Sequence, residues 1–212
     1  MSTQIHNLII LDESGSMGSV LEPTISGFNE LIQNIGLAAE KFPEQTHRLS
    51  FITFNSSGMK WVAENAAATG LSPLNRQNYR PNYGTPLYDA IGHACNKLRT
   101  WLTPETRVLV SILTDGYENA STEFSRQQIA GLVEALEEDG WTFTYMGTDQ
   151  DVKKASLEIN IKNSMHFSKS GIGLKRLFEE EKNKRDAYYQ KIQDKKWDSL
   201  KEGYFDDENL KE

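Results

Sequence analysis

The sequence predicts an α/β fold, with a doubly wound, mainly parallel central sheet, one antiparallel edge strand and helices on both faces. Strand-like and helix-like patterns alternate along the 212-residue chain, which is typical of βαβ units. The apolar runs at residues 8–11 and 108–113 are nearly continuous, as in parallel strands that are buried on both faces. The length fits one large domain, or one domain with an appendage.

The first part of the chain carries clear strand and helix signals. Residues 5–11 form an apolar run and residues 48–54 alternate apolar and polar side chains, so both are expected to be strands. Between them, residues 23–42 carry apolar side chains at helical spacing. Residues 60–63 follow an Asn-Ser-Ser-Gly turn, which predicts a short antiparallel partner strand. Residues 64–86 predict a long connection, and long loops in compact domains are usually functional.

The second part of the chain continues the alternation and ends in a long helix. By the same periodicities we expect a helix at 87–102, a central strand at 106–114, a helix at 125–138, a strand at 141–146, a short helix at 152–159, a short edge strand at 165–167 and a last helix at 173–193.

Composition narrows the classes of function. The formal net charge of -7 argues against non-specific nucleic-acid binding, which depends on neutralising phosphates. The single cysteine, Cys95, excludes a disulfide within the chain and suits a reducing compartment. The polar N-terminus lacks a basic region, and the apolar run after it is too short for a signal-peptide core or a bilayer span. We therefore expect a cytoplasmic protein that binds no membrane.

Three separate segments carry hydroxyl and carboxylate groups that suit one cation site. Asp12, Ser14 and Ser16 follow the first strand, Asp115 follows a later strand, and Thr85 ends the long connection. Ligands bind at the carboxyl ends of parallel strands in open α/β sheets. Oxygen ligands of this kind favour a hard cation, so we expect Mg2+, with Mn2+ or Ca2+ as alternatives.

The proposed ligand set would leave the metal in need of an anionic ligand. The three hydroxyl groups are neutral, and if the aspartates act mostly through water, little negative charge directly contacts the metal. Such a metal stays electrophilic, and a partner's carboxylate can displace one of its waters. Taken singly, each segment is also consistent with an ordinary turn or helix cap.

The order of these residues resembles a known family motif. Asp12, Ser14 and Ser16 read D-x-S-x-S, followed by a distant Thr85 in Gly-Thr-Pro-Leu and a distant Asp115 in Leu-Thr-Asp-Gly. This is similar to the metal-ion-dependent adhesion site of the von Willebrand factor A (vWA, or integrin I-type) domain, and none of the five positions departs from the pattern. The resemblance covers about residues 5–180 and looks like a stand-alone bacterial member.

The resemblance implies a Rossmann-like vWA fold and a binding function. Ser14, Ser16 and Thr85 would hold Mg2+ directly or in exchange with water, and Asp12 and Asp115 would act directly or through water. A Glu or Asp from a partner protein would complete the coordination. The expected function is a metal-dependent protein–protein interaction module that is not an enzyme, and the oligomeric state stays open.

The end of the chain has a different composition. We expect a vWA domain at residues 1–180 and a charged, partly amphipathic helical extension at 181–212. The charges of residues 179–201 suggest a solvated helix with intrahelical ion pairs. Its aromatic and aliphatic residues would either fold back on the protein's own sheet or pack on a partner. They are Tyr188, Tyr189, Ile192, Trp197, Leu200, Tyr204 and Phe205.

Two rival functions and some secondary residues complete the expectations. The protein is alternatively a scaffold that binds its partner through the tail, with a structural metal, or a metal-dependent hydrolase. The scattered histidines lack the spacing of a zinc site. Further candidate partner contacts precede Thr85, namely Tyr79, Arg80, Asn82 and Tyr83. Glu118 and Asn119 follow Asp115 closely and could border the metal face, although ordinary turn polarity is the favoured interpretation. Asp149 and Asp151 are expected to cap a helix.

Overall fold

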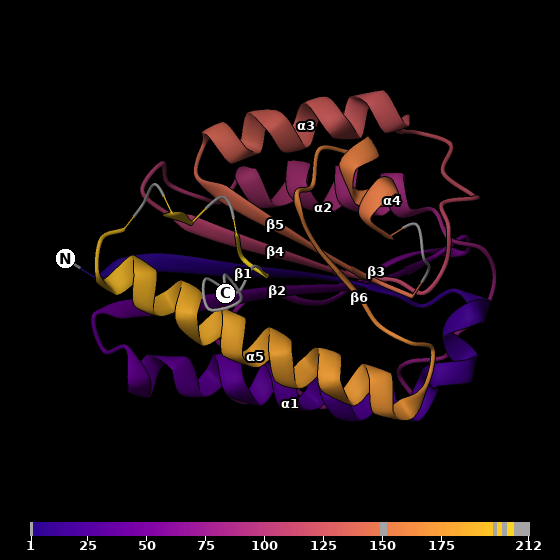
Figure 1. Ribbon diagram of the computed structural model, residues 1–212, viewed down its shortest axis with the longest axis horizontal. Coiled ribbons are helices and arrows are strands. Elements are labelled where there is room, and N and C mark those ends of the chain that lie inside the picture. The colour runs from indigo at the N-terminus through magenta and orange to yellow at the C-terminus, as the bar shows by residue number, and fades with distance from the viewer. Residues whose placement is uncertain (1, 149–151, 197–198, 201–202, 206–212) are drawn as a thin grey trace, which may run out of the picture.

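The computed structural model describes residues 2–148, 152–196, 199–200 and 203–205. Its centre is a six-stranded sheet with the strand order β3-β2-β1-β4-β5-β6. Helices cover both faces, so the molecule has three layers (Figure 1). The predicted fold class is confirmed, including a mainly parallel sheet with one antiparallel edge strand.

The strands pair as their sequences predict. Their bounds are β1 (Thr3–Asp12), β2 (Gln45–Asn55), β3 (Gly58–Ala66), β4 (Arg107–Leu113), β5 (Trp141–Gly147) and β6 (Asn163–His166). The central strand β1 runs parallel to both β2 and β4, with Leu8 opposite Ser50 and Val110. The edge strand β3 pairs antiparallel with β2. From Ile5 onward β1 is buried throughout, which explains its nearly continuous apolar sequence.

The helices divide between the two faces of the sheet. They are the 3₁₀ helix η1 (Gly15–Val20) and the α-helices α1 (Leu21–Lys41), α2 (Leu87–Arg99), α3 (Arg126–Glu138), α4 (Val152–Glu158) and α5 (Gly171–Gln193). Figure 1 shows α2, α3 and α4 on one face and α1 and α5 on the other. The sequence did not predict η1. Helix α2 ends three residues earlier than expected, because Trp101 N donates to Leu98 O in a tight turn.

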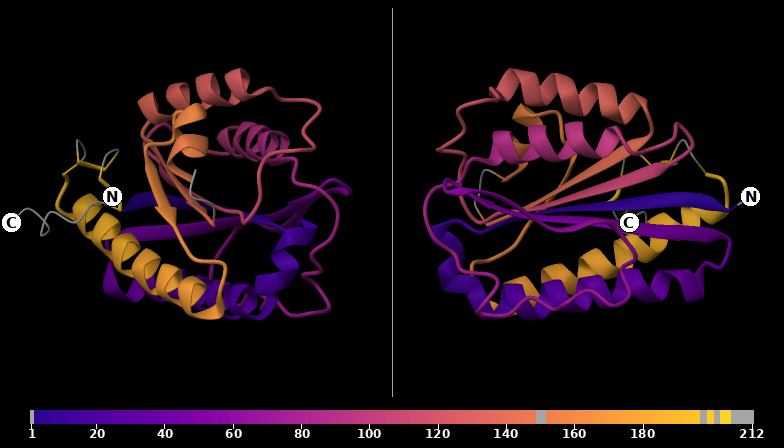
Figure 2. Two further views of the ribbon diagram at one scale, coloured as in Figure 1. Left: turned by 45° about the vertical axis from the view of Figure 1, so that its right-hand side comes forward. Right: turned by 180° about the vertical axis from the view of Figure 1, so that it is seen from behind.

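Helices α1 and α5 pack closely at a glycine. The two helices lie side by side in both views of Figure 2. A Cβ atom added at Gly27 of α1 would lie 1.9 Å from Cδ2 of Phe178 on α5. Gly27 therefore permits the close approach of the two helices, although a glycine within a helix weakens it intrinsically.

Helix α5 folds back on the protein's own sheet. Tyr188, Tyr189 and Ile192 are buried in a cluster with Ile5 of β1 and Leu109 of β4. The helix runs without a break through residue 180, after which the sequence predicted the helical extension. Trp197 lies outside the described residues, as do residues 206–212.

A buried polar network fixes α5 on the sheet. The guanidinium of Arg185 is ion-paired with Glu181 one turn earlier and donates to Asn7 Oδ1 of β1 at 2.5 Å. It also donates to Ser111 Oγ of β4 at 2.7 Å. Tyr189 Oη donates to the same Asn7 oxygen at 2.6 Å. Buried charges need such partners, so this network favours one axial position of the helix.

Candidate metal centre

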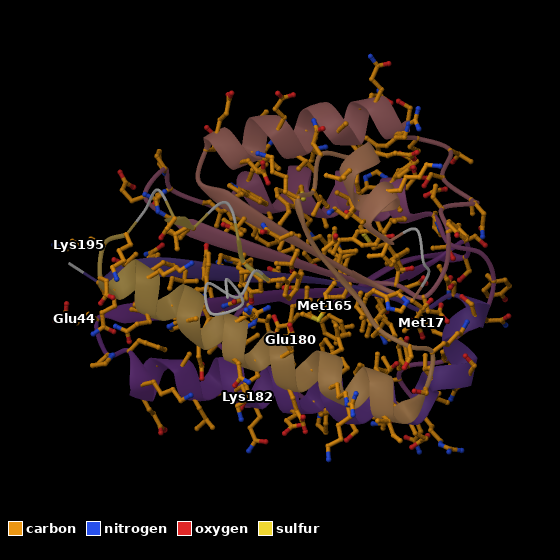
Figure 3. The ribbon with its side chains drawn as sticks, viewed as in Figure 1. Met17, Glu44, Met165, Glu180, Lys182 and Lys195 are labelled. Carbon is orange, nitrogen blue, oxygen red and sulfur yellow. The ribbon has the colours of Figure 1, made fainter. Side chains whose placement is uncertain are left out.

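The five predicted ligands lie at the carboxyl edge of the parallel strands. Asp12 ends β1, Asp115 follows the end of β4, and Thr85 stands two residues before α2. Ser14 and Ser16 lie at the start of η1. Met17 of η1, labelled in Figure 3, is fully buried among apolar residues and anchors this turn. All three segments therefore meet at this edge of the sheet.

The carboxylate of Asp12 is buried and held in place by hydrogen bonds. Its Oδ1 accepts a hydrogen bond from Ser14 N at 2.6 Å, and its Oδ2 accepts one from Thr114 Oγ1 at 2.6 Å. Burial raises the pKa of Asp12 to about 6, although these hydrogen bonds oppose the shift and the charge of Asp115 adds slightly to it. A nearby cation would relieve this cost of burying charge.

The serine and threonine hydroxyls converge beside Asp115. The Oγ atoms of Ser14 and Ser16 are 3.0 Å apart, and Ser16 Oγ donates to Asp115 Oδ1 at 2.5 Å. A Cβ atom added at Gly116 would lie 3.2 Å from Ser16 Oγ and 3.3 Å from Thr85 Oγ1. The two hydroxyls therefore face one point. Ser16 is exposed, so this point is open to solvent.

Asn119 and Glu118, which follow Asp115 in the chain, hold Thr85 and the start of α2 in place. Asn119 Oδ1 accepts a hydrogen bond from Thr85 N at 2.9 Å, and Asn119 N donates to Thr85 O at 3.1 Å. Glu118 Oε2 accepts from Tyr88 N at 2.9 Å, in the first turn of α2. The prediction of ordinary turn polarity missed this role, because no local signal shows that the segment after Asp115 folds over the start of α2.

Tyr79 has a different role from the one expected. It was a candidate partner contact, but its side chain is fully buried and its hydroxyl donates to the main-chain oxygen of Asp12 at 2.6 Å. That prediction was wrong, because the loop turns this ring inward. Tyr83 and Arg80 are exposed as expected. Tyr83 O accepts a hydrogen bond from Gly15 N at 3.0 Å, which joins the long loop to the first segment of the site.

One cation of the chain itself reaches the site. Lys169 Nζ, from the connection between β6 and α5, lies 2.7 Å from Asp115 Oδ2. The carboxylate is fully buried, and within the described residues Oδ2 accepts no hydrogen bond, so the contact is an ion pair. Nothing in the sequence marked Lys169, because only the fold brings it to the end of β4.

The donor chemistry of this cluster fits a hard cation. Three hydroxyl oxygens and two carboxylates lie together, and the buried Asp115 Oδ2 accepts no hydrogen bond from the described residues and contacts only the Lys169 ammonium among them. In the part of the chain that the structure describes, no three His, Cys, Asp or Glu residues gather in a way that would hold a metal ion. The hydroxyl-rich cluster is thus of another type than a zinc site. Asp149 and Asp151, expected to cap a helix, lie outside the described residues.

Comparison with known proteins places the fold. The family model of the von Willebrand factor type A domain matches residues 8–185. No curated protein sequence matches the chain.

Across the residues that the structure describes, no helix combines the length and hydrophobicity that crossing a membrane requires.

Several solved structures share the fold at low sequence identity. The PilB minor pilin from Streptococcus sanguinis has a TM-score of 0.58 and 14% identity, over 88% of this chain and 62% of that chain. The pilus adhesin SpaC from Lactobacillus rhamnosus GG has a TM-score of 0.64 and 14% identity, over 88% of this chain and 30% of that one. The manganese-loaded Plasmodium vivax TRAP protein has a TM-score of 0.58 and 19% identity, over 83% and 73%. This chain therefore spans about three fifths of the pilin's length, and the likeness shows the fold alone.

Proposed function

We propose that this chain, which belongs to the von Willebrand factor type A domain family, is a metal-dependent protein-interaction module that captures an acidic side chain of a partner through Mg2+. The family is known for protein–protein interaction, and one solved relative is manganese-loaded. The observation that carries the proposal is the convergence of the Ser16 and Thr85 hydroxyls beside the buried Asp115 carboxylate, on a face open to solvent.

Each ligand has a role that follows from its contacts. Ser14, Ser16 and Thr85 would offer neutral oxygens to the metal. Both oxygens of Asp12 already accept hydrogen bonds, which suits a carboxylate that acts through water. Asp115 would act directly or through water. When bound, the metal supplies a positive charge that attracts a carboxylate from outside.

Two exposed tyrosines flank the proposed capture point. Tyr83 is 61% exposed and precedes the Gly84–Thr85 step, and Tyr117 is 55% exposed and follows Gly116. Large exposed aromatic side chains are costly to leave in water and are enriched at interface hot spots. We propose that these two side chains contact the partner around its acidic residue.

The direct test is the capture of partners by matched variants. Wild type, Asp115→Asn and the exposed control Asp139→Asn are used as baits in cell lysate, each in Mg2+ and in EDTA. The proposal predicts a partner that is retained by wild type and the control in Mg2+ and lost in EDTA. It also predicts loss with Asp115→Asn, while circular dichroism shows a retained fold. Equal retention in all six conditions would contradict it.

The rival functions make different predictions. A scaffold that binds through the tail would lose its partner when the residues after 193 are deleted and keep it in EDTA. A metal-dependent hydrolase would show Mg2+-dependent turnover in a panel of phosphatase and nuclease substrates. The burial of Tyr188, Tyr189 and Ile192 against the sheet disfavours the first rival, because these side chains are not available to a partner.

We also propose that the protein works in the cytoplasm, as its composition predicts. The support is Cys95, a free and fully buried thiol whose pKa is raised by burial, so that it is poorly reactive. Cell fractionation with an antibody tests this. The type of organism and the native metal stay predictions from the motif.

A further inference from the structure

A lysine side chain contacts the carboxylate of Asp115, which the proposed metal ion would also need. Lys169 Nζ is 2.7 Å from Asp115 Oδ2, while Asp115 Oδ1 accepts the hydrogen bond from Ser16. One carboxylate thus bridges the hydroxyl cluster and the ammonium group. The side chain of Asp115 is fully buried, whereas that of Lys169 is 38% exposed. The lysine can therefore swing into solvent, and the aspartate cannot.

We propose that Lys169 is a tethered competitor of the metal, which neutralises Asp115 in the metal-free protein and is displaced when a divalent cation binds. This inference rests on the proposed metal site. It adds that the affinity of the site is set by an intramolecular cation, and that metal binding is coupled to the connection between β6 and α5.

The electrostatic reason is the cost of a buried, unpaired carboxylate. Without a cation, Asp12 and Asp115 would place two negative charges at the buried end of the sheet. Removing the partner of a buried charge is strongly destabilising, so the ammonium of Lys169 stabilises the metal-free state. A divalent cation beside the same carboxylate removes this need and repels the ammonium. The two cations therefore exclude one another at Asp115.

The position of Lys169 in the chain makes the exchange a local conformational change. Phe167, two residues earlier, is buried and its N–H donates to Gly147 O at 2.9 Å. Ser170, the next residue, caps α5 by accepting a hydrogen bond from Gly173 N at 3.1 Å. Further along α5, Arg185 fixes the helix on the sheet. Release of Lys169 is thus expected to loosen residues 168–174 and to leave the rest of α5 in place.

The first experiment measures metal affinity. Mg2+ binding is followed by calorimetry and Mn2+ binding by electron paramagnetic resonance, for wild type, Lys169→Met and the control Lys175→Met. Methionine keeps most of the length of the side chain and removes its charge. Lys175, near the start of α5, is well exposed, and its Nζ lies 3.9 Å from Glu179 Oε1. Replacing it therefore removes one positive charge close to Lys169 in the chain without touching Asp115. The proposal predicts that Lys169→Met binds both metals about tenfold more tightly or better, and the control as wild type does.

The second experiment measures the exposure of the lysine itself. Wild-type protein is treated briefly with an acetylating reagent, with and without saturating Mg2+, and each lysine is quantified by mass spectrometry. Acetylation of Lys169 is expected to become several-fold faster when the metal binds, while that of Lys175 stays constant. Hydrogen exchange on the same samples is expected to rise only within residues 168–174.

The outcomes separate this inference from the function on which it rests. If wild type and Lys169→Met bind metal equally well, or the variant binds more weakly, the competition is wrong and the metal site remains. If neither protein binds Mg2+ or Mn2+, the proposed function fails, and the inference with it. If only Lys169→Met binds, the competition holds and the lysine closes the wild-type site under those conditions.

Discussion

Asn119 and Thr85 are joined by two hydrogen bonds, one in each direction between the segment after β4 and the loop before α2. Neither bond involves the threonine hydroxyl, so that hydroxyl remains free to face Ser16 across Gly116. The amide of Asn119 thus fixes the main chain of a proposed metal ligand without competing for the ligand atom. Residues that orient ligands in this way often matter almost as much as the ligands.

Removing this amide should weaken metal binding. We expect Asn119→Ala to lower the Mg2+ affinity by roughly tenfold and the free energy of unfolding by about 1 kcal/mol, because Thr85 N loses its acceptor. Calorimetry and urea unfolding measure the two effects. Gln127→Ala, an exposed change in α3, is the control and should alter neither. An unchanged metal affinity in Asn119→Ala would show that Thr85 is not a ligand that needs positioning.

The hydroxyl of Tyr79 should contribute to stability more than to partner contact. Tyr79→Phe leaves the main-chain oxygen of Asp12 without its 2.6 Å hydrogen bond in a buried place, which is expected to cost about 1–2 kcal/mol. Chemical denaturation measures this loss. Partner capture by the folded variant should persist in Mg2+. A variant as stable as wild type would indicate that another donor replaces the hydroxyl.

The contact between α1 and α5 should tolerate no side chain at Gly27. In Gly27→Ala the new methyl group would overlap Phe178, and overpacking of this kind is expected to destabilise the protein by about 1–3 kcal/mol. Gly131→Ala in α3 is the matched control, since a Cβ there meets nothing within 4 Å and should stabilise the helix by roughly 0.5–1 kcal/mol. The double change with Phe178→Leu should recover part of the loss. Equal melting temperatures for the two alanine variants would refute this packing.

Two buried histidines should make the protein sensitive to mild acid. Burial, and secondarily the charge of Arg185, lowers the pKa of His47 from 6.5 to about 4, and burial lowers that of His6 similarly. As the pH falls below 6.5 the unfolded chain protonates these rings first. Their contribution to stability is therefore fully present above pH 6.5 and is lost as the pH falls through 4.

The variant His47→Phe isolates this effect. Phenylalanine keeps an edge-on ring against Tyr189, whose centroid is 4.5 Å from that of His47. The free energy of unfolding of wild type minus that of the variant should decrease by roughly 2–3 kcal/mol between pH 7 and pH 4, at about 1.4 kcal/mol for each pKa unit. The raised pKa of Asp12 acts in the opposite direction in both proteins, so it cancels in the difference. A difference that is independent of pH would show that His47 protonates freely in the folded state.

The two exposed tyrosines should contribute to partner binding and little to stability. Tyr83→Ser and Tyr117→Ser are each expected to weaken partner binding by about 1–2 kcal/mol, the range of interface residues at or near a hot spot. Mg2+ affinity should stay as in wild type. Leu37→Ser, which changes an exposed apolar side chain on α1, is the control. Binding that is unaffected in both tyrosine variants would move the partner surface elsewhere on the molecule.

Local patterns in the sequence were enough for the alternation of strands and helices and for the five candidate ligands. The apolar runs that end at Asp12 and just before Asp115 mark buried parallel strands, and such strands must present their carboxyl ends at one edge. The antiparallel strand β3 followed from a turn and a short alternating run. These features depend on residues that are close in the chain, so periodicity and turn chemistry reveal them.

The tertiary structure alone decided which distant residues support or oppose the site. Asn119 braces Thr85, Tyr79 turns inward to Asp12, and Lys169 pairs with Asp115, although nothing beside them in the sequence indicates it. The same holds for Arg185, whose guanidinium donates hydrogen bonds to Asn7 of β1 and Ser111 of β4, both distant in the chain. A hydrogen bond or ion pair between distant residues depends on where the packed layers bring them, and local sequence carries no record of that distance. The sequence by itself thus determined the fold class and the five candidate oxygen ligands. The packing of the layers determined which residues hold those candidates in place and brought the Lys169 ammonium to Asp115.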